Sequence, residues 1–364
     1  MLSIGIVGLP NVGKSTLFNA LLKSQLAEAA NFAFTTIEPN IGIVEVPDER
    51  LDALAEVEKS ARTVRATIKF VDIAGLIAGA HRGEGLGNKF LSHIREVEAI
   101  ALVVRFFDDS EVVHISGQIN PRKDIQTILD ELALADLEAL DKRKIGLEKE
   151  ARGMLKEATK TLEVFEKVER GFKEGKKIVD LNLTEEERKL IQETNFLTSK
   201  PFVYVFNVKE SKANETAEDL IEEFGLGEIE GIENAVVVSA KVEEELSQLS
   251  ELDQKELLGD LGLNEPGLNR LVRVAYEALD LIPFFTAGPQ EARAWTVRAG
   301  AKAPEAAGKI HSDFAKKFIK AEVVRFEDFV KLGGWKGSKE AGKARLEGRD
   351  YEVKDGDVIF FHHG

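Results

Sequence analysis

Short apolar runs alternate with amphipathic segments over the first third of the chain, and the alternation resumes near residue 200. Apolar runs bounded by turn residues are typical of strands in a buried parallel sheet. The runs that predict strands are 4–7, 41–46, 67–75, 99–107, 201–206 and 235–238. Helices are expected directly after the first run, at 48–60 and at 265–279. Strands and helices in this order predict a doubly wound α/β domain.

Between residues 125 and 172 the pattern changes to long, charged, helical sequence. Coiled-coil spacing predicts two antiparallel helices with a break near Gly153, and a capping box at Thr184 to Glu187 predicts the start of another helix. The apolar positions with this spacing are Ala133, Leu137, Leu140, Leu147, Leu155, Ala158, Leu162 and Phe165. Because the sheet pattern resumes afterwards, we expect a helical hairpin inserted in one α/β domain. The hairpin could be a solvated structural element without a chemical role, or it could be a surface that binds a partner, and the sequence leaves both interpretations open.

After residue 280 the pattern is that of a small α+β fold of about 80 residues. Residues 281–283 mark the exit from the preceding domain, and a helix is expected at 304–319. The expected strands are 294–297, 322–326 and 355–361. The predicted domains are 1–124 with 200–280 for the α/β part, 125–199 for the insertion and 281–364 for the last part.

Composition narrows the class of protein. The chain has 364 residues, of which 43% are hydrophobic and 31% charged, which is typical of a globular protein. It contains no cysteine, so disulfides and thiolate metal sites are excluded. No apolar run reaches the length of about 18 residues that a membrane span requires. We therefore expect a cytoplasmic protein without a membrane partner.

The charge is unevenly distributed. The formal net charge is −15, which argues against general coating of nucleic acid. Residues 281–364, however, hold 15 Lys and Arg against 12 Asp and Glu. This basic end permits an RNA contact through the C-terminal domain without requiring one.

The segment from Gly8 to Ser15 fits the phosphate-binding pattern G-x-x-x-x-G-K-[ST] and lies between a strand and a helix. Glycines let backbone N–H groups surround a phosphate chain, and the helix start adds its positive dipole. Lys14 is expected to reach the β- and γ-phosphates and the Ser15 hydroxyl to bind Mg²⁺. The expected binding residues here are Asn11, Val12, Gly13, Lys14, Ser15 and Thr16.

A second motif, Asp72-x-x-Gly75, follows the strand at 67–75. An aspartate there holds Mg²⁺ through water, and the glycine N–H meets the γ-phosphate. Thr36 is the expected third metal ligand, with Thr35 as the alternative. The glycine-rich segment 76–87 is expected to be a switch loop that responds to the nucleotide.

Five ordered elements together resemble the translation-factor-like GTPase superfamily and, within it, the Obg-like ATPase (YchF) family. These elements are the phosphate loop, Thr36, Asp72-x-x-Gly75, Asn207-x-x-Glu210 and Ser239-Ala240-Lys241. Patterns similar to the family's own are Asn31-Phe32-x-Phe34, the Gly83 to Gly87 loop, Ala307 to Asp313 and Asp355-Gly356-Asp357. The resemblance implies a P-loop GTPase-like core, a coiled-coil insertion and a C-terminal β-grasp (TGS-like) domain. It also implies ATP hydrolysis and association with the ribosome, through the large subunit or the whole particle.

The segment Asn207-Val208-Lys209-Glu210 is the expected base-binding motif. Guanine-selective sites have N-K-x-D at this place, and the aspartate carboxylate of that motif binds guanine. Val208 and Glu210 stand where that motif has lysine and aspartate. The extra methylene of glutamate displaces the carboxylate, so guanine selectivity is weakened and ATP becomes acceptable. The resemblance implies adenine contacts from Asn207, Val208 and Phe107, and Ser239 completes the expected set. Phe107 could instead be a core aromatic at a strand end.

The residue that follows Asp72-x-x-Gly75 also differs from that of related hydrolases, and this difference affects the catalytic step. Leu76 stands where related enzymes have a glutamine that orients water, so slow turnover or another orienting group is expected. His81, His93 and His114 are the candidates, and His114 is preferred because it lies in a polar stretch. The expected catalytic residues are thus Lys14, Gly75 and His114. Asn11 suggests K⁺ as an additional ion, as in some related proteins.

The leading hypothesis is a Mg²⁺-dependent ATPase that changes conformation with its nucleotide. One alternative is a ribosome- or RNA-binding regulatory protein in which hydrolysis is incidental. The other alternative is a conventional GTPase, which Glu210 disfavours.

Overall fold

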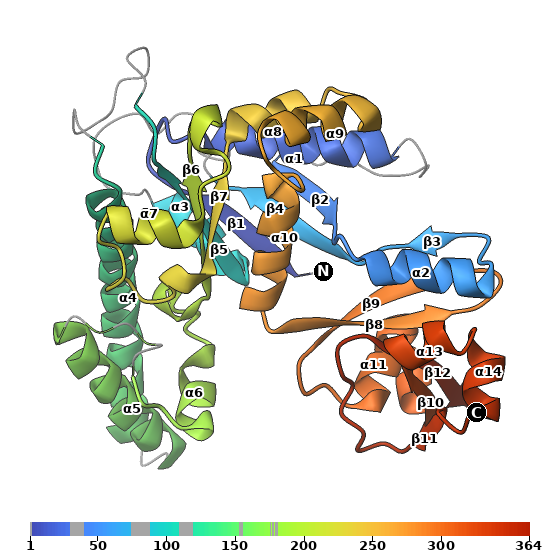
Figure 1. Cartoon of the computed structure of the whole chain (residues 1–364). Helices are drawn as coiled ribbons and strands as arrows, with labels where there is room; N and C mark the ends of the chain where they lie inside the picture. The colour runs from blue at the N-terminus through green and yellow to red at the C-terminus, as the bar shows by residue number, and fades with distance from the viewer. Residues whose placement is uncertain are drawn as a thin grey trace. The chain divides into compact units, whose positions relative to one another are not determined.

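The computed structural model describes residues 2–29, 40–73, 88–108, 119–152, 156–174, 176, 178 and 181–364. Its contacts divide the chain into two compact units. One unit comprises residues 2–42 and 69–268, and the other comprises residues 43–68 and 269–364 together with residue 1. The predicted α/β class, helical insertion and α+β C-terminal part are all present (Figure 1).

The first sheet has the strand order β2-β4-β1-β5-β6-β7. Its strands are β1 Ser3–Val7, β2 Ile41–Glu45, β4 Thr67–Asp72, β5 Ala99–Arg105, β6 Phe202–Asn207 and β7 Ala235–Val238. The pairs β1-β4, β1-β5, β5-β6 and β6-β7 are parallel. Every residue of β1, β5 and β6 is buried, which explains why these strands read as continuous apolar runs rather than as alternating ones.

Helices cover the two faces of this sheet. One apolar cluster joins the sheet to α3 Asn88–Glu96, to the start of α4 Pro121–Arg152 and to α7 Ala217–Glu223. Away from that cluster, α1 Lys14–Ala29 contacts α8 Ala240–Leu246 (Figure 1). The remaining helix of this unit is α9 Glu251–Asp260, with short 3-10 turns at Leu197–Ser199, Glu210–Lys212 and Ile232–Asn234. Helix α10 Gly267–Ala278, which the sequence analysis placed in the α/β part, belongs from residue 269 onward to the other unit.

The insertion is built from α4, α5 Lys156–Lys173 and α6 Glu185–Gln192. Its core holds Leu140 and Leu147 of α4 against Phe165 and Val168 of α5, with Leu162 packed against them. Four of the eight predicted coiled-coil positions therefore pack in this core, whereas Ala133, Leu137 and Ala158 do not belong to it and Leu155 lies outside the described residues. The expected capping box at Thr184 is present. The first turns of α4, which include Ile125, pack with the sheet instead.

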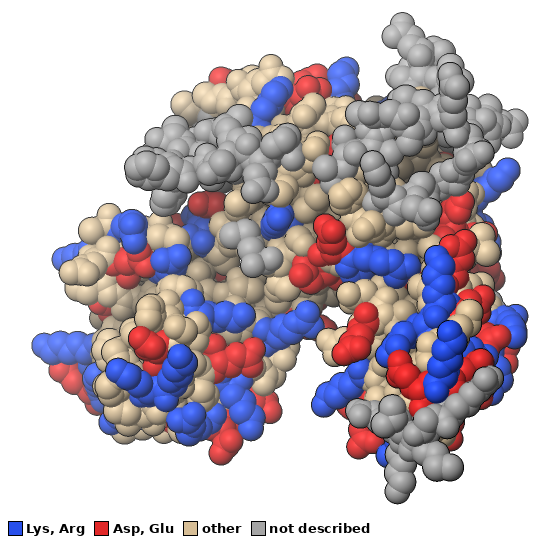
Figure 2. Space-filling model, turned by 180° about the vertical axis from the view of Figure 1, so that it is seen from behind, with Lys and Arg blue, Asp and Glu red and all other residues tan. Residues whose placement is uncertain are grey.

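The surface carries charges of both signs. Lys144 pairs with Glu169 at 2.6 Å, and Lys167 pairs with Glu187 at 2.9 Å. On the face drawn in Figure 2, Lys and Arg side chains lie interspersed with Asp and Glu side chains.

The other unit is organised by a second sheet with the order β11-β10-β12-β8-β9-β3. Its strands are β3 Thr63–Val64, β8 Leu281–Ala287, β9 Ala292–Arg298, β10 Phe318–Arg325, β11 Arg345–Glu347 and β12 Asp357–His363. Its helices are α2 Glu49–Glu58, α11 Ala303–Ile310, α12 Ser312–Lys316, α13 Phe326–Lys331 and α14 Trp335–Glu340.

Residues 43–68, which the sequence analysis placed with the α/β part, pack in this second unit. Strand β3 pairs in parallel with β9. The Arg50 guanidinium donates to both carboxylate oxygens of Asp355 at 3.0 and 3.1 Å, and the Trp335 backbone N–H donates to Glu58 at 3.1 Å. The segment that precedes Asp72 is therefore hydrogen-bonded to residues 277 and 305 positions away along the chain.

Two details of the C-terminal prediction are wrong. The helix expected at 304–319 is divided into α11 and α12, and β10 begins at Phe318. The division occurs because His311 adopts an extended conformation, with φ −159° and ψ 140°, and its ring accepts from the Asp313 N–H as the cap of α12. Residues 281–283, expected to mark the passage into the C-terminal part, are the first residues of β8, a strand that was not predicted.

Among the helices of the described residues, we find none that combines the length and the apolar character needed to span a membrane.

Candidate nucleotide-binding site

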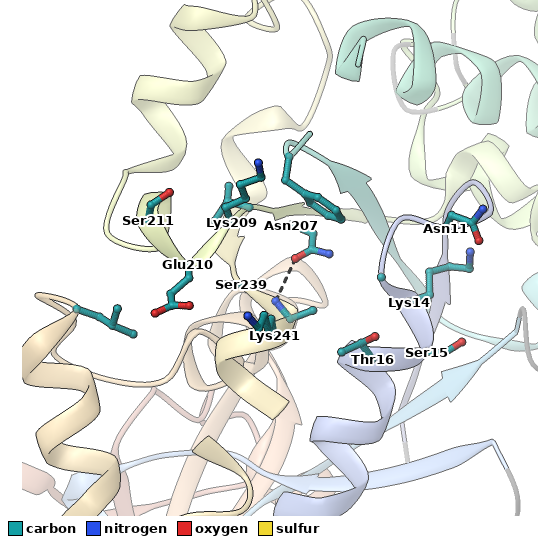
Figure 3. A pocket seen from close by; sticks show the side chains of 15 residues that line it. Asn11, Lys14, Ser15, Thr16, Asn207, Lys209, Glu210, Ser211, Ser239 and Lys241 are labelled. Carbon is teal, nitrogen blue, oxygen red and sulfur yellow. Dashed lines mark hydrogen bonds between the residues drawn. The ribbon is translucent and has the colours of Figure 1, made fainter. Parts of the chain in front are cut away.

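A cavity of about 860 Å³ lies where β5, β6 and β7 end and α1 begins (Figure 3). This is the edge at which parallel α/β sheets bind ligands. The residues that line it are Asn11, Gly13, Lys14, Ser15, Thr16, Phe107, Asn207, Val208, Lys209, Glu210, Ser211, Ser239, Ala240, Lys241 and Leu261. The cavity thus brings the phosphate loop together with both base-binding motifs.

The backbone of the phosphate loop has positive φ angles at three residues, two of which are glycines. Gly8 and Gly13 have φ of 157° and 94°, and Asn11 has φ of 62°. A Cβ on Gly8 would lie 2.5 Å from the Val103 carbonyl oxygen, and a Cβ on Gly13 would collide with the side-chain amide of Asn207. The glycines are therefore required by close packing as well as by backbone angles.

Lys14 is positioned at the floor of the loop. Its Nζ donates to the Leu9 carbonyl oxygen at 2.6 Å, and the residue is buried. Burial lowers the pKa of the Lys14 amine to about 8, and the negative charge of Asp72 opposes this shift. A buried cation with a carbonyl as its partner can be stabilised further by an arriving phosphate.

Asp72 ends β4, next to β1 and the phosphate loop, and is 4% exposed. Its Oδ1 atom has no hydrogen-bond partner among the residues that the structure describes. An unpaired carboxylate oxygen at this depth is costly unless a ligand or ion satisfies it. Oxygen ligands of this kind suit Mg²⁺, and the Ser15 hydroxyl at the start of α1 is also available at the cavity.

Asn207 connects the two halves of the cavity. Its Nδ2 donates to the Val12 carbonyl oxygen at 2.8 Å. Its Oδ1 accepts from the Ala240 N–H at 3.0 Å, the bond that is dashed in Figure 3. The side chain is 5% exposed, so both bonds are shielded from water. Asn207 therefore holds the phosphate loop and the β7–α8 loop in one arrangement.

Phe107 lies at the cavity wall rather than in the apolar core, where its neighbour Phe106 packs. The Arg105 guanidinium lies 4.6 Å from the centre of the Phe107 ring, and its Nε donates to the Phe107 carbonyl oxygen at 2.9 Å. Arg105 is 1% exposed. A buried cation thus supports this aromatic ring, which suits a surface for base stacking.

Val208 and Ser239 are buried at the base end of the cavity, whereas Lys209 and Glu210 are exposed. The Val208 N–H donates to the Val238 carbonyl oxygen at 3.0 Å, and its side chain packs in the apolar cluster of the sheet. Glu210 is the first residue of the 3-10 turn Glu210–Lys212.

Several predicted site residues lie outside the described residues: Thr36, its alternative Thr35, Gly75, His81 and His114. His93 lies on α3 with its ring 3.8 Å from Glu96, and it does not line the cavity. The described part of the cavity therefore contains the other predicted phosphate-loop residues and the base end, whereas Val12 and Asp72 do not line it.

Three residues escaped sequence reasoning: Arg105, Leu261 and Ser211, the last of which directly follows the Asn207-x-x-Glu210 motif. Arg105 had a signal, because it is a single charged residue within the apolar run 99–107. Leu261, the residue after α9, had no signal in the sequence, because it lies about 20 positions beyond the last motif. It reaches the cavity only through the packing of α9.

Family models match both ends of the chain. Residues 3–145 match a model described as "50S ribosome-binding GTPase". Residues 281–364 match the model of the C-terminal part of YchF GTPases, which is described as a protein of unknown function.

Curated relatives match over nearly the whole length. "Ribosome-binding ATPase YchF" of Haemophilus influenzae is 52% identical over 360 residues, which cover 98% of this chain and 98% of that protein. The protein of the same name from Bacillus subtilis is 48% identical over 364 residues, which cover 99% and 98%.

Among solved structures, too, a YchF protein matches over nearly the whole chain. The YchF GTPase of Schizosaccharomyces pombe superimposes with a TM-score of 0.89 at 36% identity and covers 99% of this chain and 97% of its own. A GTP binding protein from Pyrococcus horikoshii, with a TM-score of 0.61 at 21% identity, shows the fold alone. The names of these relatives differ in the nucleotide that they specify.

Proposed function

Because the chain belongs to the YchF family, we propose that it binds and hydrolyses ATP with Mg²⁺, accepts GTP less well, and associates with the ribosome as a nucleotide-dependent switch. The observation that carries the proposal is the Asn207 bridge, because it joins the phosphate loop and the base end into one cavity. Work on the ribosome would place the protein in the cytoplasm.

The described residues fit a magnesium ion. Ser15 and Asp72 would hold it, with Thr36 as the third protein ligand, and Oδ1 of Asp72 is already buried without a partner among described residues. When bound, the ion neutralises charge that develops on the phosphates. Asn11, exposed on the phosphate loop, would similarly support a K⁺ ion.

In the reaction, water attacks the γ-phosphorus, the bond to the bridging oxygen breaks, and ADP leaves with that oxygen. Lys14 stabilises the phosphate oxygens, and the Gly75 N–H contacts the γ-phosphate. Leu76 cannot orient the attacking water because it has no polar side-chain atom, so His114 is proposed for that role. Without such a group the intrinsic rate would be slow.

The domain assignment remains a proposal as well: 1–124 with 200–280 for the nucleotide, 125–199 for the helical insertion and 281–364 for the TGS-like part. The C-terminal unit adds an apolar hollow lined by Trp295, Phe314 and Phe360, with Phe360 53% exposed. Aromatic side chains at a surface suit RNA bases, so this unit favours the second candidate, a ribosome- or RNA-binding regulator with incidental hydrolysis.

One experiment separates these functions. Non-hydrolysable analogues of ATP and GTP are titrated into the nucleotide-free protein with Mg²⁺, and phosphate release is then followed with and without ribosomes. ATP binding at least as tight as GTP binding, with turnover raised by ribosomes, supports the ATPase switch. Turnover and ribosome binding that are independent of each other support the regulator. A GTP preference of about a hundredfold would make this a conventional GTPase.

A further inference from the structure

The helical insertion is joined to the sheet at two crossings of the chain. On the way out, α4 packs with the sheet up to Ala135 and with the core of the insertion from Leu140 onward (Figure 1). On the way back, Phe196 belongs to the core of the insertion and Leu197 to the apolar cluster of the sheet. Both crossings lie in the unit that contains the nucleotide cavity.

The buried carboxylate of Asp136 bonds the two crossings together. It accepts from the Leu197 N–H, the Thr198 N–H and the Thr198 hydroxyl, each at 2.8 Å. The side chain of Asp136 has no exposed surface. Burial raises the pKa of this carboxyl, and the three donors oppose the rise. Residues 135–136 and 194–198 thus form one bonded unit, which we call the root of the insertion.

A cation from α3 completes the root. The Arg95 guanidinium donates to the carbonyl oxygens of Asn195 at 2.8 Å and of Ala135 at 3.3 Å. It also lies 3.7 Å from Oδ1 of Asp136, where its charge opposes the rise in the pKa of that carboxyl. The Lys200 amine in turn donates to the Arg95 carbonyl oxygen at 3.1 Å, near the end of α3. Arg95 is therefore bonded to both crossings at once.

These polar contacts fix a geometry more than they add stability. Removing charges from water costs free energy that their mutual attraction barely repays, and apolar side chains often close such a site at lower cost. What the contacts add is direction, because the 2.8 Å bond to Asn195 is lost when its atoms separate by about 1 Å. The root therefore has one position relative to α3.

Along the chain, α3 directly follows the segment that is expected to sense the nucleotide. It begins at Asn88, after the Asp72-x-x-Gly75 motif and residues 76–87. Its nine residues form a rod of about 14 Å, and Arg95 lies in the last turn. Helices in switching proteins shift by about 1–2 Å. A shift of that size breaks the Arg95 bonds unless the root moves with the helix.

We propose that Arg95 makes the root follow α3, so that the helical insertion takes a different position with a triphosphate than with a diphosphate. The coupling rests on the proposed function, since a switch needs two nucleotide states. Because coupling between two binding sites is reciprocal, a partner that binds the insertion changes the preference for triphosphate over diphosphate by the same factor. The helical insertion is then the part of the molecule through which a partner regulates the ATPase, which favours the partner surface over the solvated element.

Hydrogen exchange at the root tests this coupling. The full chain is saturated with Mg²⁺ and either ADP or a non-hydrolysable ATP analogue, and exchange in the peptide 194–200 is followed by mass spectrometry. This peptide contains the Leu197 and Thr198 amides, which are bonded to Asp136. We expect their exchange rates to differ at least about fivefold between the two nucleotides. Arg95→Met should abolish the difference while both nucleotides still bind.

Arg143→Met is the matched control. Arg143 is exposed about two turns beyond Asp136 along α4, and it pairs with Glu150 of the same helix at 3.4 Å. This variant should keep the difference between the two nucleotides. If Arg95→Met does not fold, Arg95→Lys replaces it, since lysine keeps the charge beside Asp136 but lacks the planar pair of nitrogens that reaches both crossings.

Equal exchange in the two nucleotide states of the unaltered protein would overturn the coupling. So would a difference that survives in Arg95→Met, or one that disappears in Arg143→Met as well. None of these results changes ATP hydrolysis by the unaltered protein, which is measured separately as phosphate release. Absence of that hydrolysis removes the proposed function, and exchange with the nucleotide that does bind still decides the role of Arg95.

Discussion

The phosphate end and the base end of the cavity are built in different ways. At the phosphate end, eight consecutive residues supply the loop, the cation and the helix start. At the base end, Phe107, Asn207, Ser239 and Leu261 come from four separate segments. The comparison teaches that triphosphate binding is a local property of the sequence, whereas the choice of base depends on how distant segments pack.

Loss of Lys14 should have the largest effect, since it removes the only charge contributed to the phosphates by the loop itself. We expect Lys14→Met to lower ATP hydrolysis by about 10²–10³-fold, measured as phosphate release. In the absence of nucleotide the same variant should be more stable than the unaltered protein at pH 7, because burial of the charged amine is unfavourable.

The sign of that stability change depends on pH. The pKa of Lys14 is lowered from 10.5 to about 8 in the folded protein, so the penalty is fully present below pH 8 and fades as the pH rises to 10.5. Denaturant unfolding of both proteins at pH 7 and pH 10.5 checks this, and an equal difference at the two values would contradict it.

Asn207→Ala should damage both ends at once. It leaves the Val12 carbonyl and the Ala240 N–H unpaired, each at a cost of about 1–3 kcal/mol. We expect a lower melting temperature and ATP binding weaker by about tenfold or more. The exposed Asn264→Ala serves as the control in calorimetry and thermal melting. Unchanged ATP binding would show that the two ends are independent.

Phe107→Ala should affect the base end alone. Stacking contributes about 1–3 kcal/mol per base, so ATP affinity should fall roughly 5- to 100-fold while affinity for inorganic triphosphate stays constant. Calorimetry with both ligands makes the distinction. If triphosphate binding fell equally, Phe107 would belong to the support of the phosphate loop.

A rise in pH should affect the phosphate end alone. Lys14 loses its proton above pH 8 in the free protein, and a bound triphosphate favours the protonated form, so binding takes up a proton there. ATP affinity should fall about tenfold between pH 7 and pH 9. Titrations in buffers of different ionisation enthalpy measure the uptake, and Lys14→Met should show no such dependence.

Glu210→Asp should have the smallest effect. Shortening the carboxylate by one methylene restores part of the guanine-binding geometry, although Val208 and Lys209 still differ from the usual motif. We expect GTP affinity to rise by less than about tenfold relative to ATP. Competition between the two nucleotides measures the ratio, and a shift toward ATP would contradict the role assigned to Glu210.

The sequence by itself determined the elements whose information is local. The strands at 4–7 and 235–238 and the cap at Thr184 were predicted closely, because each depends on a few neighbouring residues. The phosphate loop was recognisable for the same reason, since its glycines and Lys14 act through adjacent backbone. The coiled-coil spacing likewise predicted the helical insertion.

Tertiary structure decided what depends on contacts between distant residues. Nothing local shows that residues 43–68 pair with β9 and with Asp355, because apolar alternation does not specify a partner strand. Only packing reveals that Arg105 supports Phe107, that Leu261 reaches the cavity and that the Ser239 hydroxyl is buried without a partner among the described residues. The motif predicted a nucleotide-binding site, and the fold set the surroundings of its base end.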